Sequence, residues 1–258
     1  MALDKDSLAS LAARMLSDYD NATPGTAFAE GLRLELPDAW RLQSAVTRLR
    51  EARGEKVIGF KVGCVCPGNQ KRMGVQHPVW GRLWELERHQ DGATLTKANY
   101  ANISIEAEFG IILARPVTGD MSLDEVESCV HAVYPLLELH NLAMRGEPPH
   151  GHELVANNCI NCGVVLGAPV TDFSHSRATD LKLVYDGTVV EQWEALAWPG
   201  DILAAVNWLA GNLSEHGIAL QSGDLLLTGA WGPPIPVENH TRVEVTSSAF
   251  GNVSATFT

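Results

Sequence analysis

Apolar positions in the first 55 residues recur at the three- and four-residue spacing of an amphipathic helix. A second helix is predicted after Pro37, which suits a first helical turn because its missing N–H would have no helical partner there. Gly54 is expected to end this second helix. The first helix is predicted from one apolar face, formed by Leu8, Leu11, Ala12, Met15 and Leu16.

From residue 57 onward the pattern changes to the alternation and short apolar runs of β-strands. Two helices are predicted among the strands: one begins with a capping box of Ser122 and Glu125 and runs to about residue 132, and one covers residues 202–215. We therefore predict an α+β fold, with an N-terminal helical region at residues 1–56, a strand-rich domain at residues 57–258, and one continuous functional unit. The predicted strands cover residues 57–63, 102–113, 134–139, 164–166, 181–185, 189–192, 225–228, 242–247 and 253–257.

Composition narrows the functional classes. The chain has 258 residues, of which 45% are hydrophobic and 19% charged, as expected of a globular protein. Its net charge of −12, without any cluster of Lys or Arg, argues against nucleic-acid and membrane roles. The same charge repels an acidic substrate, so a local positive charge such as a metal ion would be needed to bind one.

The chain is expected to be cytoplasmic. No run of about 18 apolar residues is present, and the N-terminus lacks the continuous apolar segment of a signal peptide. The five cysteines are expected to be reduced, and Cys159 and Cys162 are interpreted as core residues, because no second Cys-x-x-Cys pair accompanies them.

Three glutamates form the main candidate site. Strand alternation places Glu106 and Glu108 on one face of the strand at residues 102–113. A Glu-x-Glu pair is most often a solvated strand face, but nothing basic flanks this one. Glu138 lies in another apolar strand, where a lone carboxylate is costly to bury unless it is paired or binds a metal. The three carboxylates together suit Mg²⁺ or Mn²⁺.

Lys61 is the second candidate, because it interrupts the apolar strand at residues 57–63. It either extends to solvent at a strand edge, or is a cation that holds a substrate carboxylate, or is an acid/base group with a lowered pKa. His150 and His152 lie in a Pro/Gly segment that is interpreted as a solvated or mobile loop, with a lid over the site as the alternative. Thr228 and Gly229 form either a rigid turn or part of the pocket mouth.

A set of short motifs, spread over nearly the whole chain, resembles the 2-keto-4-pentenoate hydratase / 4-oxalocrotonate decarboxylase family of the fumarylacetoacetate hydrolase superfamily. The resemblance implies a mixed β-roll core, a Mg²⁺ or Mn²⁺ bound by Glu106, Glu108 and Glu138, and Lys61 facing a small 2-oxo acid substrate. The motifs are AWRLQ from Ala39, IGFKVG from Ile58, MGV from Met73, PVWGRL from Pro78, IEAEF from Ile105, Leu137-Glu138, GDLLLTGA from Gly223 and FGNVSATF from Phe250.

Some positions depart from the family pattern. Val79 stands where hydratases commonly carry an acidic residue and decarboxylases an apolar one, and Asn141 replaces an acidic residue. The segment from Asn157 to Asn161 replaces an Asp-Asn-Ala-Ser-Ser-like stretch. Asn158 and Asn161 in this segment, with Lys61, Thr228 and Gly229, are the residues expected to contact substrate.

The resemblance implies a metal-dependent lyase of aromatic-compound catabolism that acts on a small 2-oxo acid or its 2-hydroxy-dienoate enol. A bound metal would stabilise an enolate by chelating the 2-oxo and carboxylate oxygens. Hydratase activity is the leading hypothesis and 4-oxalocrotonate-type decarboxylation the second. An acylpyruvate-type C–C hydrolase and an inactive homologue acting as a partner subunit are the further alternatives. A homo-oligomer is expected.

Overall fold

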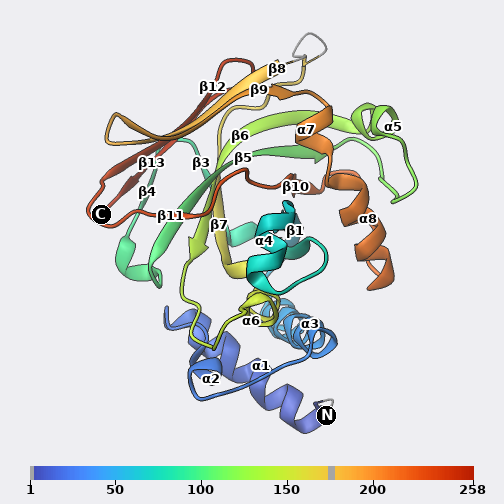
Figure 1. Ribbon diagram of the computed structural model, residues 1–258, viewed down its shortest axis with the longest axis vertical. Helices are drawn as coiled ribbons and strands as arrows, with labels where there is room; N and C mark the ends of the chain where they lie inside the picture. The colour runs from blue at the N-terminus through green and yellow to red at the C-terminus, as the bar shows by residue number, and fades with distance from the viewer. Residues whose placement is uncertain (1–2, 174–177) are drawn as a thin grey trace.

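The computed structural model describes residues 3–173 and 178–258. The N-terminal helices α1 (Lys5–Asp20), α2 (Thr26–Ala29) and α3 (Leu36–Ala52) lie at one end of the molecule (Figure 1). Asp4 caps α1 by accepting a hydrogen bond from the Ser7 amide, and a proline opens α3 as predicted. The helical pattern of this region is therefore confirmed. Helix α2 was not predicted, because four residues are too few to show a helical periodicity.

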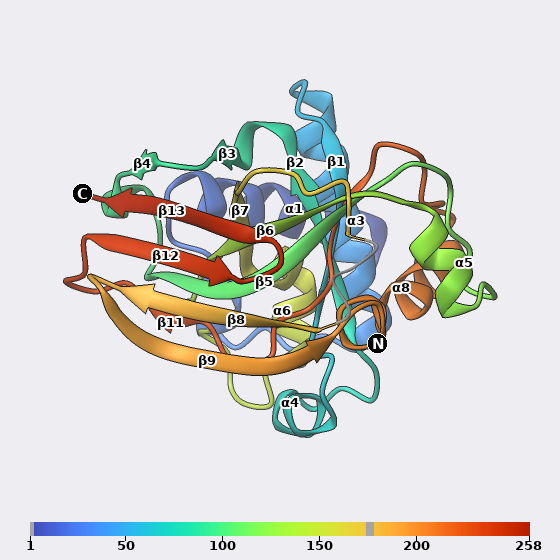
Figure 2. The same ribbon diagram turned by 90° about the horizontal axis from the view of Figure 1, so that it is seen from above.

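Two mixed sheets form the body of the protein. The larger contains β2, β1, β10, β5, β6, β7 and β3 in that order, with β11 paired to β5; β1 runs parallel to β10 and β3 parallel to β7. The smaller sheet has the order β4-β13-β12-β8-β9 and lies at the end opposite the N-terminal helices (Figures 1 and 2). The strands are β1 (Val57–Gly63), β2 (Val79–Trp84), β3 (Arg88–Gln90), β4 (Ala93–Leu95), β5 (Ile103–Leu113), β6 (Val130–Asn141), β7 (Asn161–Leu166), β8 (Ala178–Tyr185), β9 (Thr188–Ala197), β10 (Leu225–Leu227), β11 (Ile235–Pro236), β12 (Arg242–Ser247) and β13 (Gly251–Phe257).

The remaining helices are short. The capping box of Ser122 is confirmed, but its helix ends at Ser128 and not at residue 132, because the chain enters β6 at Val130. The single helix predicted over residues 202–215 is two helices. These elements are α4 (Pro67–Met73), α5 (Leu123–Ser128), α6 (Gly151–Ala156), α7 (Gly200–Leu203) and α8 (Val206–Glu215), with 3₁₀ turns η1 (Glu85–Glu87), η2 (Lys97–Asn99) and η3 (Asn158–Ile160).

Only the first part of the segment at residues 148–152 is the solvated loop that the sequence suggested, since Pro148 and Pro149 are exposed. His150 stands at the N-cap position of α6, Gly151 is buried, and His152 Nδ1 lies 2.5 Å from the Leu34 carbonyl oxygen. A Cβ added to Gly151 would lie 2.4 Å from the Met73 carbonyl oxygen, so the segment is packed tightly against the end of α4. The start of α6 is therefore held in place beside the first part of the strand-rich body.

The N-terminal helices are joined to the body through a buried ion cluster. Arg50 of α3 pairs with Glu55 and Glu87, and Tyr19 of α1 donates a hydrogen bond of 2.7 Å to Glu87. The Arg50 guanidinium also lies 4.0 Å from the centroid of the Trp84 ring.

Within the described residues no helix is long and apolar enough to cross a bilayer.

Central strands β5 and β6 are covered on both faces, which makes them the buried frame of the fold. Phe109, Ile111 and Leu137 belong to the main apolar core. Neighbouring β1 approaches β10 so closely that a Cβ on Gly59 would lie 1.8 Å from the Leu225 carbonyl oxygen, which only glycine permits. The observed architecture is the predicted α+β fold.

Candidate metal centre and active site

The register of β5 and β6 brings two of the predicted glutamates together. Glu106 of β5 lies directly opposite Glu138 of β6 in an antiparallel pair, so both side chains leave the same face. Glu108 and His140 lie two residues away on their respective strands and share that face. The predicted convergence of acidic side chains from separate strands is therefore present in the backbone itself.

Lys61 reaches this face from β1. Its Nζ donates to Glu138 Oε1 at 2.9 Å, and both side chains are almost completely buried. Asn161 Nδ2 donates to the same oxygen at 2.8 Å. Burial would raise the pKa of Glu138, but the positive charges of Lys61 and His140 lower it to about 2. The charge of Glu138 in turn holds the pKa of Lys61 above its ordinary value despite burial.

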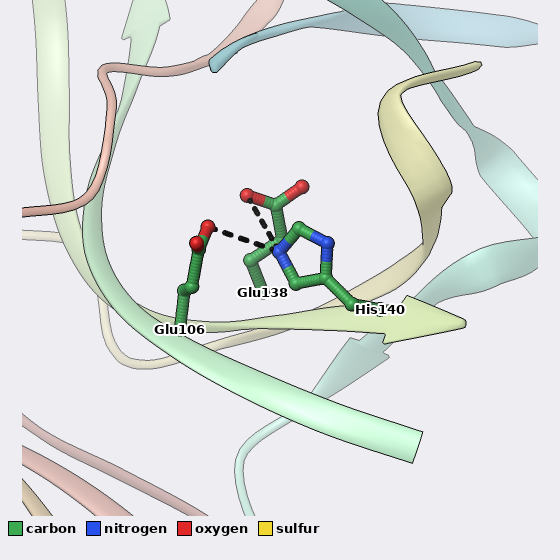
Figure 3. A group of neighbouring side chains, drawn as sticks. All are labelled: Glu106, Glu138 and His140. Carbon is green, nitrogen blue, oxygen red and sulfur yellow. Dashed lines mark hydrogen bonds and ion pairs between the residues drawn. The ribbon is translucent and has the colours of Figure 1, made fainter. Parts of the chain in front are cut away.

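His140 is a site residue to which the sequence reasoning gave no role. Its Nε2 lies 3.0 Å from Glu106 Oε2 and 3.4 Å from Glu138 Oε2 (Figure 3). Burial lowers the pKa of the imidazole, but Glu138 and Glu106 outweigh this effect and raise it to about 9. One potential ligand atom from each of these three residues lies within 4.8 Å of the others. The two-residue spacing from Glu138 was the signal that could have identified it.

Glu108 is the most exceptional group of the site. Its side chain is fully buried, and among the described residues neither carboxylate oxygen makes a hydrogen bond of normal geometry, although the Gly229 backbone amide slightly lowers its pKa. Glu108 is not part of the group within 4.8 Å that Glu106, Glu138 and His140 form. Burial, followed by repulsion from Glu138, raises its pKa well above the ordinary value, although Lys61 opposes the rise. An ionised carboxylate in this position requires a further cation. The oxygen-rich donor set of Glu106, Glu108 and Glu138 fits a hard divalent metal.

A cavity of about 180 Å³ opens onto this centre. Lys61, Glu106 and His140 supply its charged lining close to the carboxylates. Apolar side chains contribute much of the rest of the wall, among them Val62, Met73, Leu142, Met144, Leu154 and Ile160. The arrangement offers a small organic acid a charged binding end and an apolar wall for its carbon chain.

The other predicted substrate residues are absent from the lining of this cavity, and two of them, Asn158 and Asn161, line a separate cavity beside α1 and α3. Asn158 holds strand β2: its Oδ1 accepts from the Arg82 amide at 2.7 Å and its Nδ2 donates to the Arg82 carbonyl at 2.9 Å. Thr228 donates to the Phe109 carbonyl at 3.1 Å, and Gly229 has a φ of 107° that favours glycine. Asn161 acts on the site through Glu138.

Two polar lining residues, Asn69 and Arg72 of α4, had no role in the sequence analysis. His150, for which a lid over the site was the alternative interpretation, lines the cavity from the start of α6. A solitary arginine in a seven-residue polar helix carries no sequence signal of its own. Its position depends on how α4 packs against the rest of the chain.

Comparison with known proteins identifies the family. The model of the fumarylacetoacetate (FAA) hydrolase C-terminal domain matches residues 86–258. A 2-keto-4-pentenoate hydratase of Burkholderia vietnamiensis is 31% identical with 99% of each chain covered, and one of Paraburkholderia phymatum is 29% identical with 85% of each covered. The structure of 4-oxalocrotonate decarboxylase from Pseudomonas putida G7, complexed with magnesium and adipate, covers 100% of this chain and 99% of its own, with a TM-score of 0.89 and 25% identity. The resemblance inferred from the motifs is confirmed, and the chain belongs to the fumarylacetoacetate hydrolase family.

Proposed function

We propose that this protein is a divalent-metal-dependent lyase that acts on a small 2-oxo acid or its 2-hydroxy-dienoate enol, as a hydratase. The observation that carries the proposal is the buried Lys61–Glu138 ion pair beside Glu106, Glu108 and His140, at the base of a cavity of small-molecule size. The hydratase and decarboxylase relatives support the same class of chemistry.

Glu106, Glu108 and Glu138 would hold the metal, either Mg²⁺ or Mn²⁺. When bound, this ion supplies Lewis-acid stabilisation of negative charge on the 2-oxo group of the substrate. The unpartnered oxygens of Glu108 support this ligand set, because their burial is costly without a cation. His140, which contacts both Glu106 and Glu138, is expected to fix the orientation of these two carboxylates.

Lys61 would bind the substrate carboxylate. Its raised pKa, caused by the neighbouring glutamates, keeps Nζ protonated at neutral pH. An acid–base catalyst needs a pKa close to the working pH, so Lys61 fits the role of a fixed cation, and the groups that transfer protons must be sought elsewhere. Asn161 would keep Glu138 in the rotamer that faces Lys61.

Decarboxylation is the second candidate function, and Val79 is the observation that favours it. Val79 pairs with Gly63 across β1 and β2, and a Cβ added to Gly63 would lie 3.6 Å from both Val79 Cγ2 and Lys61 Nζ. The side chain nearest to this flank of Lys61 is therefore apolar, and it offers no carboxylate to activate a water molecule.

One experiment separates the alternatives. The Mg²⁺-loaded protein is mixed with 2-hydroxypenta-2,4-dienoate and, separately, with 4-oxalocrotonate, while ultraviolet absorbance and CO₂ are recorded. A hydratase consumes the dienol without CO₂; a decarboxylase releases CO₂ from 4-oxalocrotonate. Absence of Mg²⁺-dependent turnover of either compound, or of any acylpyruvate, would contradict the proposal and favour an inactive partner subunit.

We also propose a cytoplasmic homo-oligomer in which residues 1–56 and 57–258 act as one functional unit. All five cysteines are free, which suits a reducing compartment. Strand β9 forms an edge of the smaller sheet and exposes Val189 and Val190, which suits pairing with a second copy. The Arg50–Glu87 ion pair between α3 and η1 supports the single unit. Light scattering coupled to size exclusion measures the subunit number.

A further inference from the structure

The cavity that contains Lys61 also carries a second cationic side chain, Arg72. Arg72 lies in the last turn of α4, and its guanidinium donates to Asn69 Oδ1 at 2.9 Å; both residues line the cavity. Among the described residues, no carboxylate lies within 4.0 Å of this guanidinium. Five arginines of this chain pair with glutamate or aspartate, namely Arg14, Arg41, Arg50, Arg53 and Arg242. Among the described arginines without such a partner, Arg72 is distinguished by its place in the lining of the cavity that contains Lys61.

The helix dipole does not explain why Arg72 faces the cavity. Basic residues are favoured in the last turn of a helix because they lie near its unpaired carbonyl groups. Lys71 stands in the same turn and meets that preference, but it is not part of the cavity lining. The two neighbouring cations therefore differ in one respect that matters for a ligand: only Arg72 borders the space that a substrate would fill.

Arg72 is carried on an anchored element. Gln70 of the same helix donates to the Cys64 carbonyl at 3.0 Å, which ties α4 to the end of β1. The helix ends at Gly74, where an added Cβ would lie 2.6 Å from Pro149 Cγ. This contact places the end of α4 against the segment that carries His150, another lining residue. The backbone that carries the exposed Arg72 side chain is thus fixed before any ligand arrives, which lowers the entropic cost of binding.

Cys64 senses the charges of both Lys61 and Arg72. Burial raises the pKa of its thiol to about 11, while the positive charges of Lys61 and Arg72 both oppose the rise. Both cations are therefore within electrostatic reach of one residue of the lining. A dianionic ligand in this cavity would meet one positive charge at Lys61 and a second at Arg72, with apolar side chains such as Leu142 and Leu154 along the wall.

We propose that the substrate is a dicarboxylic 2-oxo acid, or its enol, whose distal carboxylate is bound by Arg72 with support from Asn69. This inference rests on the proposed function, in which Lys61 and the metal bind the 2-oxo end. The planar guanidinium can form two parallel hydrogen bonds to one carboxylate, and it replaces the water that an anion would otherwise lose on entering an apolar cavity.

A matched pair of unreactive ligands tests the proposal. 2-Oxoadipate and 2-oxohexanoate both have six carbons and the same 2-oxo acid group, and they differ only in a terminal carboxylate or methyl group. Their dissociation constants are measured by titration calorimetry on the Mg²⁺-loaded full chain. The wild-type protein is expected to bind 2-oxoadipate about 10- to 100-fold more tightly, as one charge-assisted contact implies.

Three variants test whether Arg72 causes this preference for the dicarboxylic ligand. Arg72→Gln is expected to reduce the affinity ratio to about one. Arg72→Lys is expected to restore part of it, because a lysine keeps the charge but lacks the parallel N–H donors of the guanidinium. Lys71→Gln removes the same charge from the same helical turn and is expected to leave the ratio unchanged. An unchanged thermal unfolding midpoint for each variant shows that the fold is intact.

The possible outcomes separate this inference from the proposed function. Equal binding of both ligands by the wild type, or an unchanged ratio in Arg72→Gln, would overturn the dicarboxylate inference and leave the lyase proposal standing. An equal loss in Lys71→Gln would also overturn it, because the effect would then reflect net charge. If neither ligand binds in a Mg²⁺-dependent manner and no dienol is consumed, the proposed function fails and the inference fails with it.

Discussion

Replacement of Glu108 by glutamine is expected to have opposite effects on stability in the absence and presence of a divalent metal. Without metal, the buried carboxylate of Glu108 has no hydrogen-bond partner and is repelled by Glu138, so it destabilises the folded state. The amide is neutral and removes this repulsion. With metal, the same carboxylate becomes a ligand, and the amide is a much poorer one.

The magnitudes follow from general values. The gain in the metal-free variant comes from removing the negative charge, since the glutamine amide would also lack a partner; each unit by which the pKa of Glu108 is raised, up to the assay pH, corresponds to about 1.4 kcal/mol. Mg²⁺ at 100 times its dissociation constant adds about 2.7 kcal/mol to a protein that binds it only when folded. For a chain of this size, this increment corresponds to a rise of about 5–10 °C in the unfolding midpoint of the wild type. The variant should show little of that rise.

The pH dependence has a defined sign. The pKa of Glu108 is raised in the folded state, so the folded protein retains a proton that the unfolded chain releases. The metal-free wild type should therefore lose stability relative to Glu108→Gln as the pH rises above the ordinary glutamate value of 4.5. The stabilising effect of the substitution should grow over the same range.

The assay is differential scanning calorimetry with EDTA or with MgCl₂. Glu153→Gln is the matched control: Glu153 is also buried, but its oxygens accept from the Arg145 and Gly146 amides at 2.8 and 2.9 Å. This control should lose stability in both conditions and retain the Mg²⁺ increment. A Glu108→Gln protein that keeps the full increment, or that is less stable than the wild type in EDTA, would refute the reasoning.

Three further results are expected. Lys61→Met should lower kcat/KM for dienol turnover by about 10- to 100-fold through loss of one charge-assisted contact, and a value within about threefold of the wild type would argue against its role as the cation that binds the substrate carboxylate. Arg50→Met leaves the buried Glu87 without its cation, removes one of the two cations paired with Glu55, and should cost about 3–5 kcal/mol in urea unfolding. Arg53→Met, at a more exposed site, leaves Glu55 paired with Arg50 and should cost about 1 kcal/mol or less. Because the pKa of Glu138 is lowered to about 2, its contribution to stability is present above pH 4.5 and lost as the pH falls towards 2. In EDTA, the difference in unfolding free energy between wild type and Glu138→Gln should shrink over this interval; a constant difference would contradict the shift.

Strand periodicity was sufficient to predict the acidic side of the site. The alternation around Glu106 and Glu108 and the isolated position of Glu138 each depend on local sequence, and β5 and β6 follow that pattern. The pairing of Glu106 with Glu138 depends on the register of two strands that are far apart in the sequence, which no local pattern specifies. The role of His140 depends on the same register, since its two-residue spacing from Glu138 predicts only that the two side chains share a face.

Short elements held by tertiary contacts were beyond the reach of local sequence. α4 is fixed by the bond from Gln70 to the Cys64 carbonyl, and α6 by the close approach of Gly151 to Met73. By local sequence, residues 129–132 could continue a helix or begin a strand, and pairing with β5 stabilises the strand. The position of Arg72 in the cavity follows from the packing of α4, so it could be recognised only in three dimensions.

The central claim is that three glutamates from β5 and β6 bind one divalent cation beside Lys61. Crystals grown with Mn²⁺ and 2-oxoadipate, with diffraction recorded at the manganese absorption edge, test this claim most directly. The account predicts a single strong anomalous peak about 2.0–2.3 Å from carboxylate oxygens of Glu106, Glu108 and Glu138, with Lys61 Nζ in contact with the bound acid. A peak elsewhere, or an ion that Glu108 does not coordinate, would contradict it.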